Sequence, residues 1–176
     1  MNAILEAMEK RRSVRKYKPD MVPQDAISNV ISAGLYAASG MNRQDTIIIA
    51  VTNKEVRDRL SAANAEIMGT KSDPFYGAPV VLVVLVVLAS KASPTRVYDG
   101  SLTLGNMMLA ASTLGLGSCW IHRAREEFER PEWKQFLKEQ GIEGDWEGIG
   151  HLILGYPDGE MPRAHERKPG RVFFVK

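Results

Sequence analysis

An uninterrupted apolar run from Ala78 to Ala89 places the strongest constraint on how this chain folds. The run is 12 residues long and contains Pro79, whereas a membrane-spanning helix needs about 20 apolar residues. Its Val-Val-Leu-Val-Val-Leu-Val-Val-Leu portion lacks the polar alternation of a strand with one face in water. We therefore expect a central β-strand that is covered on both faces, and no association with a membrane.

The remaining sequence predicts further helices and strands around this run. Apolar residues at helical spacing predict helices over 2–10, over 54–68, over 101–114 and over 131–139. Pro23 suits the first turn of a further helix, whose predicted buried stripe is Ile27, Val30, Ile31, Gly34, Leu35 and Ala38. Short apolar or β-branched runs predict further strands at 46–51, 118–122, 149–154 and 171–175. Gly115 or Gly117 is expected to end the 101–114 helix with a positive φ. Five strands interleaved with about five helices indicate one mixed α/β layered domain over residues 1–176, without deciding between parallel and antiparallel pairing.

Two of these segments indicate contacts with a second copy of the chain. The 101–114 helix is apolar nearly all round, so it should be surrounded by protein, either in the core or at a subunit interface. The terminal run from Arg171 to Val175 would leave a bare strand edge unless it paired within its own chain or with another subunit. Together, the two segments favour a homodimer.

Charge and cysteine usage indicate which class of ligand the chain binds and which cellular compartment it occupies. A single cysteine, Cys119, cannot form an internal disulfide, and Glu6 stands where a signal peptide would have its apolar core, so we expect a cytoplasmic protein. The net charge is only +2, yet cations concentrate at 10–18 and 163–176. The two clusters indicate a discrete anionic ligand, or simply two solvated charge runs. We expect no nucleic-acid partner, because aromatic interleaving and a recognition-helix pattern are missing.

Motifs for the commonest nucleotide-binding and hydrolytic chemistries are absent from the sequence. It contains no P-loop, Rossmann turn or GxSxG elbow, and its three histidines lack the clustering of a zinc site. What remains is Arg-Arg-Ser-Val-Arg-Lys-Tyr at 11–17, which is either a charged helix end or a clamp for phosphate. The polar loop at 38–44 is either a plain turn or a place where Asn and Gln contact the edge of a heterocycle.

Six motifs in register make the chain resemble the FMN-dependent nitroreductase family, of the short single-domain type. They are Arg11 to Tyr17, Ala38 to Gln44, the Ala78-Pro79-Val-Val strand, Leu114 to His122, Leu154-Gly-Tyr-Pro157 and Glu166-Arg-Lys-Pro169. They cover essentially the whole chain. The resemblance implies an α+β fold with a mixed, mostly antiparallel sheet flanked by helices. It also implies an intertwined homodimer with two FMN molecules at its interface.

The same resemblance implies roles for individual residues. Arg11 and Ser13, with Arg12 beside them, fall where the family binds the FMN phosphate. Arg167, with Lys168 as a second contact, would close that phosphate site, and Arg15 would face the pyrimidine edge of the flavin. Ser39, Asn42 and Gln44 would come from the partner chain. The backbone of Trp120, Ile121 and His122 would lie along the flavin, with a main-chain N–H near His122 approaching N5.

By this resemblance the chain is an enzyme that passes electrons from NADH or NADPH through FMN to a small-molecule acceptor. Donor and acceptor would alternate on one flavin face in a ping-pong cycle, and the acceptor would be a nitroaromatic, quinone, free flavin or enone. The flavin carries the chemistry, so no catalytic acid or base is required. Two alternatives stay open: an FMN-binding sensor or carrier without turnover, and a reductive dehalogenase-like or flavin-destroying relative. Phe75 and Tyr76 would cover the flavin face or pack in the core, and Cys119 is expected to pack as a small apolar residue.

Overall fold

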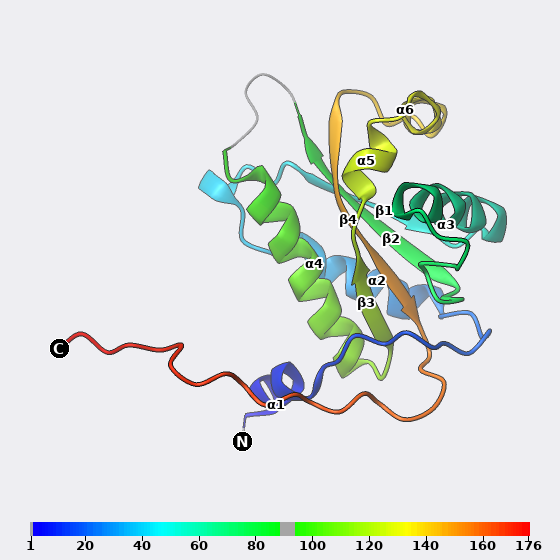
Figure 1. Cartoon of the computed structure of the whole chain (residues 1–176). Coiled ribbons are helices and arrows are strands. Elements are labelled where there is room, and N and C mark those ends of the chain that lie inside the picture. The colour runs from blue at the N-terminus through cyan, green and yellow to red at the C-terminus, as the bar shows by residue number, and fades with distance from the viewer. Residues whose placement is uncertain (1, 89–93) are drawn as a thin grey trace.

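A four-stranded sheet forms the centre of the computed structural model, which describes residues 2–88 and 94–176 (Figure 1). The strands are β1 (Thr46–Val51), β2 (Val80–Val87), β3 (Gly117–Ile121) and β4 (Trp146–Gly155). Their spatial order is β1-β2-β4-β3, and all three neighbouring pairs are antiparallel. The apolar run thus supplies a central strand, as predicted. Ala89, its last residue, lies outside the described residues.

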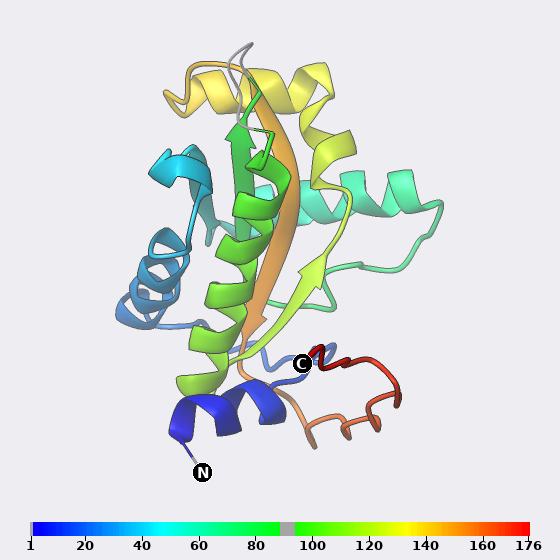
Figure 2. The same ribbon diagram turned by 90° about the vertical axis from the view of Figure 1, so that its left-hand side faces the viewer.

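Helices cover both faces of this sheet (Figures 1 and 2). The helices of the described chain are α1 (Ala3–Lys10), α2 (Gln24–Leu35), the short 3-10 helix η1 (Gly40–Asn42), α3 (Lys54–Met68), α4 (Arg96–Thr113), α5 (Ala124–Phe128) and α6 (Pro131–Glu139). Side chains of α2 and α4 pack on one face, and those of α3, α5 and α6 pack on the other. No helix in the described part of the chain is long and apolar enough to cross a membrane.

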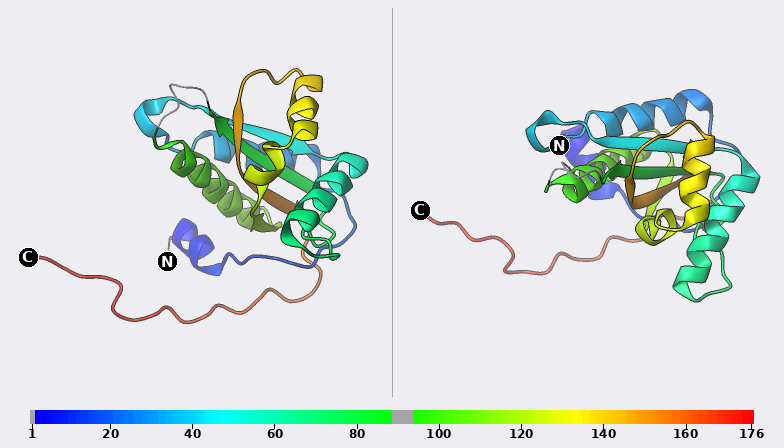
Figure 3. Two further views of the ribbon diagram at one scale, coloured as in Figure 1. Left: turned by 45° about the horizontal axis from the view of Figure 1, so that its top comes forward. Right: turned by 90° about the horizontal axis from the view of Figure 1, so that it is seen from above.

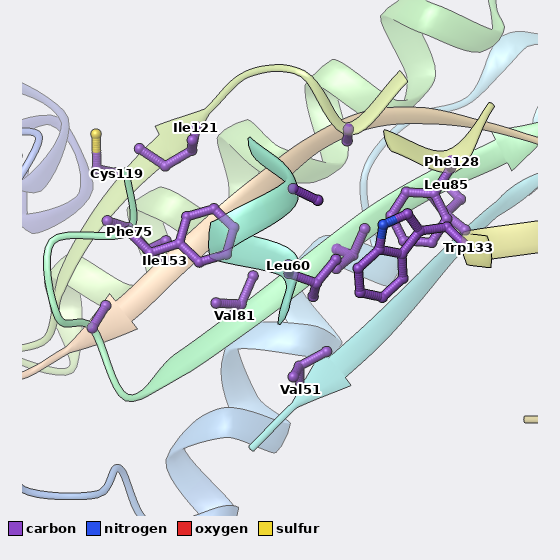
Figure 4. Packing of buried hydrophobic residues seen from close by; sticks show 14 of the residues in the cluster. Val51, Leu60, Phe75, Val81, Leu85, Cys119, Ile121, Phe128, Trp133 and Ile153 are labelled. Atoms are coloured by element: carbon purple, nitrogen blue, oxygen red, sulfur yellow. The ribbon is translucent and has the colours of Figure 1, made fainter. Parts of the chain in front are cut away.

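The uniform hydrophobicity of β2 follows from its place between these two helical layers. Val81, Val83 and Leu85 point into the cluster under α3, α5 and α6, part of which is shown in Figure 4. The alternate residues Leu82 and Val84 pack instead against α2 and α4. Because side chains of a strand alternate between faces, a strand buried on both sides must be apolar at every position.

The predicted strand at 171–175 is absent, which reduces the expected five strands to four. The chain leaves the sheet after β4, and its last residues run away from the body of the molecule (Figures 1 and 3). Phe173 and Phe174 are 83% and 86% exposed. A strand needs a hydrogen-bonding neighbour, and this segment has none among the described residues. The sequence reasoning also missed α5, because five residues are too few to show helical periodicity.

Helix α4 differs from the prediction in its extent and in its burial. It begins at Arg96 rather than near residue 101, and it buries Thr103, Leu104 and Met107, whereas Leu102 is 50% exposed. One side of this helix is therefore not enclosed by its own chain, and the predicted alternative, a subunit interface, stays a prediction. Gly115, at φ 73°, follows it in the left-handed conformation, which confirms that part of the prediction.

Helix α2 also departs from its predicted stripe. Pro23 caps the helix instead of lying in its first turn. Ile27, Val30 and Gly34 are buried, but Leu35 is 60% exposed. The last residue of the predicted stripe, Ala38, lies beyond the helix end, because α2 stops at Leu35.

Candidate functional site

The cationic segment 11–17 lies against the first residues of β3. The Val14 N–H donates to the Ser118 carbonyl over 3.0 Å, and Ser13 forms an isolated parallel bridge with Ser118. Val14 also packs so closely on Gly117 that a Cβ there would lie 2.9 Å from its side chain. Glycine at 117 therefore lets the segment approach the strand. The sheet fixes the backbone of the segment, while Arg15 stays exposed.

Two guanidiniums of this segment have buried nitrogens with no hydrogen-bond partner in the described part of the chain: Arg11 Nη1 and Arg12 Nε. Arg12 also donates through Nη1 to the carbonyls of Glu9 and Arg11, both at 2.6 Å. Part of its guanidinium therefore binds carbonyl groups at the C-terminal end of α1. Arg11 makes no ion pair with any described residue. An unsatisfied buried donor is costly, and an anion would satisfy these donors with charge-assisted hydrogen bonds.

The polar loop at 38–44 holds a strained conformation through its own hydrogen bonds. Met41, Asn42 and Gln44 have φ values of 55°, 53° and 55°, in the region that favours glycine. Ser39 Oγ accepts from the Gln44 N–H over 3.1 Å, and the Gln44 amide donates to Asn42 Oδ1 over 3.1 Å. Asn42 and Gln44 remain exposed. The loop therefore presents a preorganised set of polar groups to its surroundings.

This loop and the cationic segment lie at opposite ends of α4 (Figure 1). The Gly40 N–H donates to Asp99 Oδ1 over 3.1 Å, in the first turn of α4. Helix α1, which leads into Arg11, lines a groove with Ala110 and Thr113 in the last turns of α4. Eleven residues at 1.5 Å each separate Asp99 from Ala110, or roughly 16 Å along the axis. One chain alone does not bring the two motifs into one site.

The stretch from Trp120 to His122 offers mainly its backbone. Ile121 is buried, and a Cβ at Gly150 would lie 2.3 Å from Trp120 Nε1, so the Trp120 ring lies directly on β4. Only His122 has an exposed side chain here. Its carbonyl accepts from Asn64 Nδ2 over 2.8 Å. Sequence reasoning missed Asn64, because nothing in its helical spacing distinguishes it from a core position.

Arg167 and Lys168 lie in the exposed segment after β4. Every residue from 159 to 176 is exposed, and neither side chain makes a hydrogen bond or ion pair with the described residues. The structure of one chain therefore does not bring them to Arg11. Their approach to the cationic segment remains a prediction.

Phe75 and Cys119 lie in the core, whereas Tyr76 does not. Phe75 is fully buried, with its ring centroid 5.2 Å from that of His151, which is also fully buried. Tyr76 is 41% exposed. Cys119 is 2% exposed within the apolar cluster under α3, so it packs as a small apolar residue, as expected.

Asp73 organises the turn that leads into β2. Its carboxylate accepts from the Phe75 and Gly77 N–H groups over 2.8 and 2.7 Å, and from Arg57 Nη2 over 2.6 Å. Ser61 donates to it as well. Burial by itself would raise the Asp73 pKa, but these hydrogen bonds outweigh burial and hold the pKa below its usual value. The carboxylate is committed to structure rather than to acid–base chemistry.

Comparison with known proteins identifies the family. A family model described as "Nitroreductase family" matches residues 8–156, which is most of the chain. The chain belongs to the nitroreductase family. The match includes the cationic segment, the 38–44 loop and the whole sheet, but it ends before the exposed terminal segment.

Individual relatives place this nitroreductase-family chain more closely. A protein of Methanothermobacter thermautotrophicus, provisionally named NADH dehydrogenase/NAD(P)H nitroreductase, is 30% identical over 66% of this chain; the alignment spans 59% of that relative's length. The NADPH-flavin oxidoreductase of Vibrio harveyi is 25% identical over 98% of this chain and 72% of its own. A nitroreductase from Bacteroides fragilis, solved with bound FMN, superimposes with a TM-score of 0.87, 28% identity and full coverage of both chains. The α+β fold that the sequence predicted is confirmed.

Proposed function

We propose that this protein is an FMN-dependent NAD(P)H oxidoreductase that reduces nitroaromatic, quinone or similar small acceptors by a ping-pong mechanism. The observation that carries the proposal is the pair of buried, unpartnered guanidinium nitrogens on Arg11 and Arg12. They belong to a segment that the family model covers, and a structural neighbour of 28% identity binds FMN. A phosphate monoester is an anion of the size and charge that such donors satisfy.

The residues of the cationic segment fit the different parts of FMN. Arg11, Arg12 and the Ser13 hydroxyl would bind the phosphate, and the exposed Arg15 would stand at the pyrimidine edge of the flavin. When bound, FMN supplies the hydride transfers, from the nicotinamide and then to the acceptor. The role of this chain is to bind and orient the cofactor and to place positive charge beside it. No side chain needs to exchange a proton with the substrate in this proposal.

Two copies of the chain would share each site in an intertwined homodimer. The proposal rests on the separation of the motifs, because the 38–44 loop and Arg11 lie at opposite ends of α4. A partner would bring its Ser39, Asn42 and Gln44 to the first copy's cationic segment. The exposed segment after β4, with Arg167, Lys168 and two exposed phenylalanines, would wrap the partner. Such dimers typically bury more than roughly 2,000 Å².

The purified protein tests the proposed activity in two separate half-reactions. It should be yellow with bound flavin, and anaerobic NADH or NADPH should bleach it in the absence of any acceptor. A panel of a nitroaromatic, a quinone, an enone and free flavin should then restore the colour at different rates. Steady-state kinetics with both substrates varied should give parallel reciprocal plots. A yellow protein that neither nicotinamide bleaches would instead be a flavin-binding sensor or carrier.

Sedimentation velocity tests the shared site independently of turnover. At micromolar concentration the holoprotein should sediment at about twice the chain mass of 19.5 kDa. Removing FMN should shift the protein toward the monomer, because the cofactor would bridge the two copies. A monomer that keeps a full complement of FMN would contradict the shared site while leaving the oxidoreductase proposal intact.

A further inference from the structure

The turn that follows β3 contains a residue in an unfavourable backbone conformation. Arg123 has φ 80° and ψ 8°, in the left-handed region that glycine tolerates and side chains with a Cβ avoid. Its guanidinium makes no hydrogen bond or ion pair with the described residues, so the side chain itself does not explain the strain. Strain of this kind persists only where the surrounding structure enforces it.

Contacts from three elements hold the turn in place. Asn64, fully buried in α3, donates from Nδ2 to the His122 carbonyl over 2.8 Å. The Glu127 N–H of α5 donates to the Arg123 carbonyl over 3.1 Å. Gly148 of β4 lets the α5 backbone approach, because a Cβ there would lie only 2.1 Å from the Ala124 carbonyl oxygen. Of these contacts, only the one from Asn64 is a side-chain hydrogen bond that one substitution can remove.

Asn64 makes this contact at a cost to its own hydrogen bonding. Its Oδ1 is buried and has no partner in the described part of the chain, so half of the amide is unsatisfied. An apolar residue would avoid that cost at a fully buried position. The donor on Nδ2 is thus the feature that distinguishes asparagine from leucine here. The peptide group whose His122 carbonyl binds Asn64 also contains the Arg123 N–H. This N–H donates to no acceptor among the described residues and stays available to a ligand.

We propose that Asn64 is a positioning residue. It holds the His122–Arg123 turn so that the free main-chain N–H of Arg123 is oriented toward the flavin. This inference rests on the proposed function, which places the backbone after Trp120 along FMN. Asn64 contacts the chain just after the end of β3, whereas the cationic segment bonds to Ser118 at the start of that strand, so removal of Asn64 should leave the phosphate contacts of Arg11 unchanged. The turn would relax toward an ordinary φ, and the N–H would change its direction.

The test compares three variants with the wild type. Asn64→Leu removes the donor and keeps the number of heavy atoms and the branching of the side chain. Asn53→Ala removes the cap of the same helix, where Asn53 Oδ1 accepts from the Val56 N–H. The double variant Asn64→Leu/Arg123→Gly removes the cost of the positive φ that Asn64 otherwise enforces, because glycine adopts positive φ freely. Each protein is measured for amide exchange at residues 121–125, for the FMN dissociation constant and for the reduction potential of the bound flavin.

Asn64→Leu should speed exchange in the turn, weaken FMN binding roughly three- to tenfold, as expected for one lost hydrogen bond, and move the potential. Arg123→Gly in that background should restore a large part of the binding and the potential. Asn53→Ala should lower stability without moving the potential. If Asn64→Leu does not fold, Asn64→Ser, whose side chain is too short to reach the carbonyl, replaces it.

Two outcomes overturn different statements. If the wild type binds FMN and Asn64→Leu shows the same potential and affinity as Asn53→Ala, Asn64 has only a structural role and the inference is wrong. If the wild type binds no FMN, the proposed function itself is wrong. Faster exchange in the turn of Asn64→Leu would then still show that Asn64 holds it.

Discussion

Two regions of this chain contain similar side chains in opposite environments. In the inner cluster, defined by Phe75, Phe128 and Trp133, every ring is at most 2% exposed (Figure 4). In the terminal segment 159–176, Phe173 and Phe174 are 83% and 86% exposed. The inner cluster is complete within one chain, whereas the terminal segment carries apolar surface that water does not favour. Exposed apolar surface of this kind marks a place where another protein surface is expected.

Polar groups show a comparable contrast between the turn at Asp73 and the cationic segment 11–17. Near the inner cluster, the Asp73 carboxylate accepts hydrogen bonds from two backbone N–H groups and from Arg57. In the cationic segment, Arg11 Nη1 is buried without a partner in the described part of the chain. The Asp73 carboxylate is thus satisfied within its own chain, whereas the unsatisfied donor on Arg11 is available to a ligand or a partner.

The largest expected effect separates the two sets of aromatic rings. Phe75→Ala should lower the free energy of unfolding by about 3–5 kcal/mol, because it opens a cavity in the packed interior. Phe174→Ala should leave the stability of the isolated monomer within about 0.5 kcal/mol of the wild type. Urea denaturation at two widely different protein concentrations measures both. In the proposed homodimer, the cost of Phe174→Ala should appear only at the higher concentration.

An equal loss of stability from both substitutions in dilute solution would break the comparison. It would mean that the terminal segment packs on its own chain.

The prediction from sequence succeeded where one physical pattern dominated. Strand β2 is apolar at every position because both of its faces are buried, and that alone identifies it. The strand predicted at 171–175 has equally suitable residues, but a strand requires a neighbour, and composition does not reveal which edge is available. The cationic segment could be identified as a candidate site from its charges. The contribution of Asn64 could not, because it depends on a hydrogen bond to a residue 58 positions away.

The next effect sharpens the contrast between satisfied and unsatisfied cations. Arg11→Ala should weaken FMN binding by about 1.5–3 kcal/mol, the scale of a charge-assisted hydrogen bond. Arg125→Ala is the matched control, since Arg125 is an exposed arginine already bonded to Glu129 over 3.0 Å. Titration of the apoprotein with FMN, followed by flavin fluorescence, measures both affinities. Equal affinities in the two variants would remove Arg11 from the phosphate site.

Cys119→Ala should leave flavin content and turnover nearly unchanged.

Asp73→Asn tests the satisfied polar network and carries a definite pH dependence. The folded-state pKa of Asp73 is lowered, so its carboxylate contributes stability above the unfolded-state pKa, and that contribution disappears as pH falls through the folded-state pKa. At neutral pH the substitution should cost about 1–2 kcal/mol, with partial exposure of the side chain limiting the effect. Urea midpoints of wild type and variant should converge as the pH falls below about 4. A difference independent of pH would assign the cost to shape rather than to charge.

The smallest expected effect concerns Arg15, which is exposed in the single chain and would gain its environment only from the cofactor. A guanidinium beside the pyrimidine edge favours the more negative, reduced form of the bound flavin. At an effective dielectric near 20, one charge about 4 Å away is worth up to roughly 4 kcal/mol before solvent screening. A quarter of that corresponds to about 20 mV for a two-electron couple.

Arg15→Gln keeps a hydrogen-bond donor and removes the charge, so it should lower the reduction potential by about that amount with a smaller effect on FMN affinity. A dye-coupled anaerobic titration at fixed pH measures the shift. If the variant binds FMN poorly while its potential stays unchanged, Arg15 belongs with Arg11 in the phosphate site.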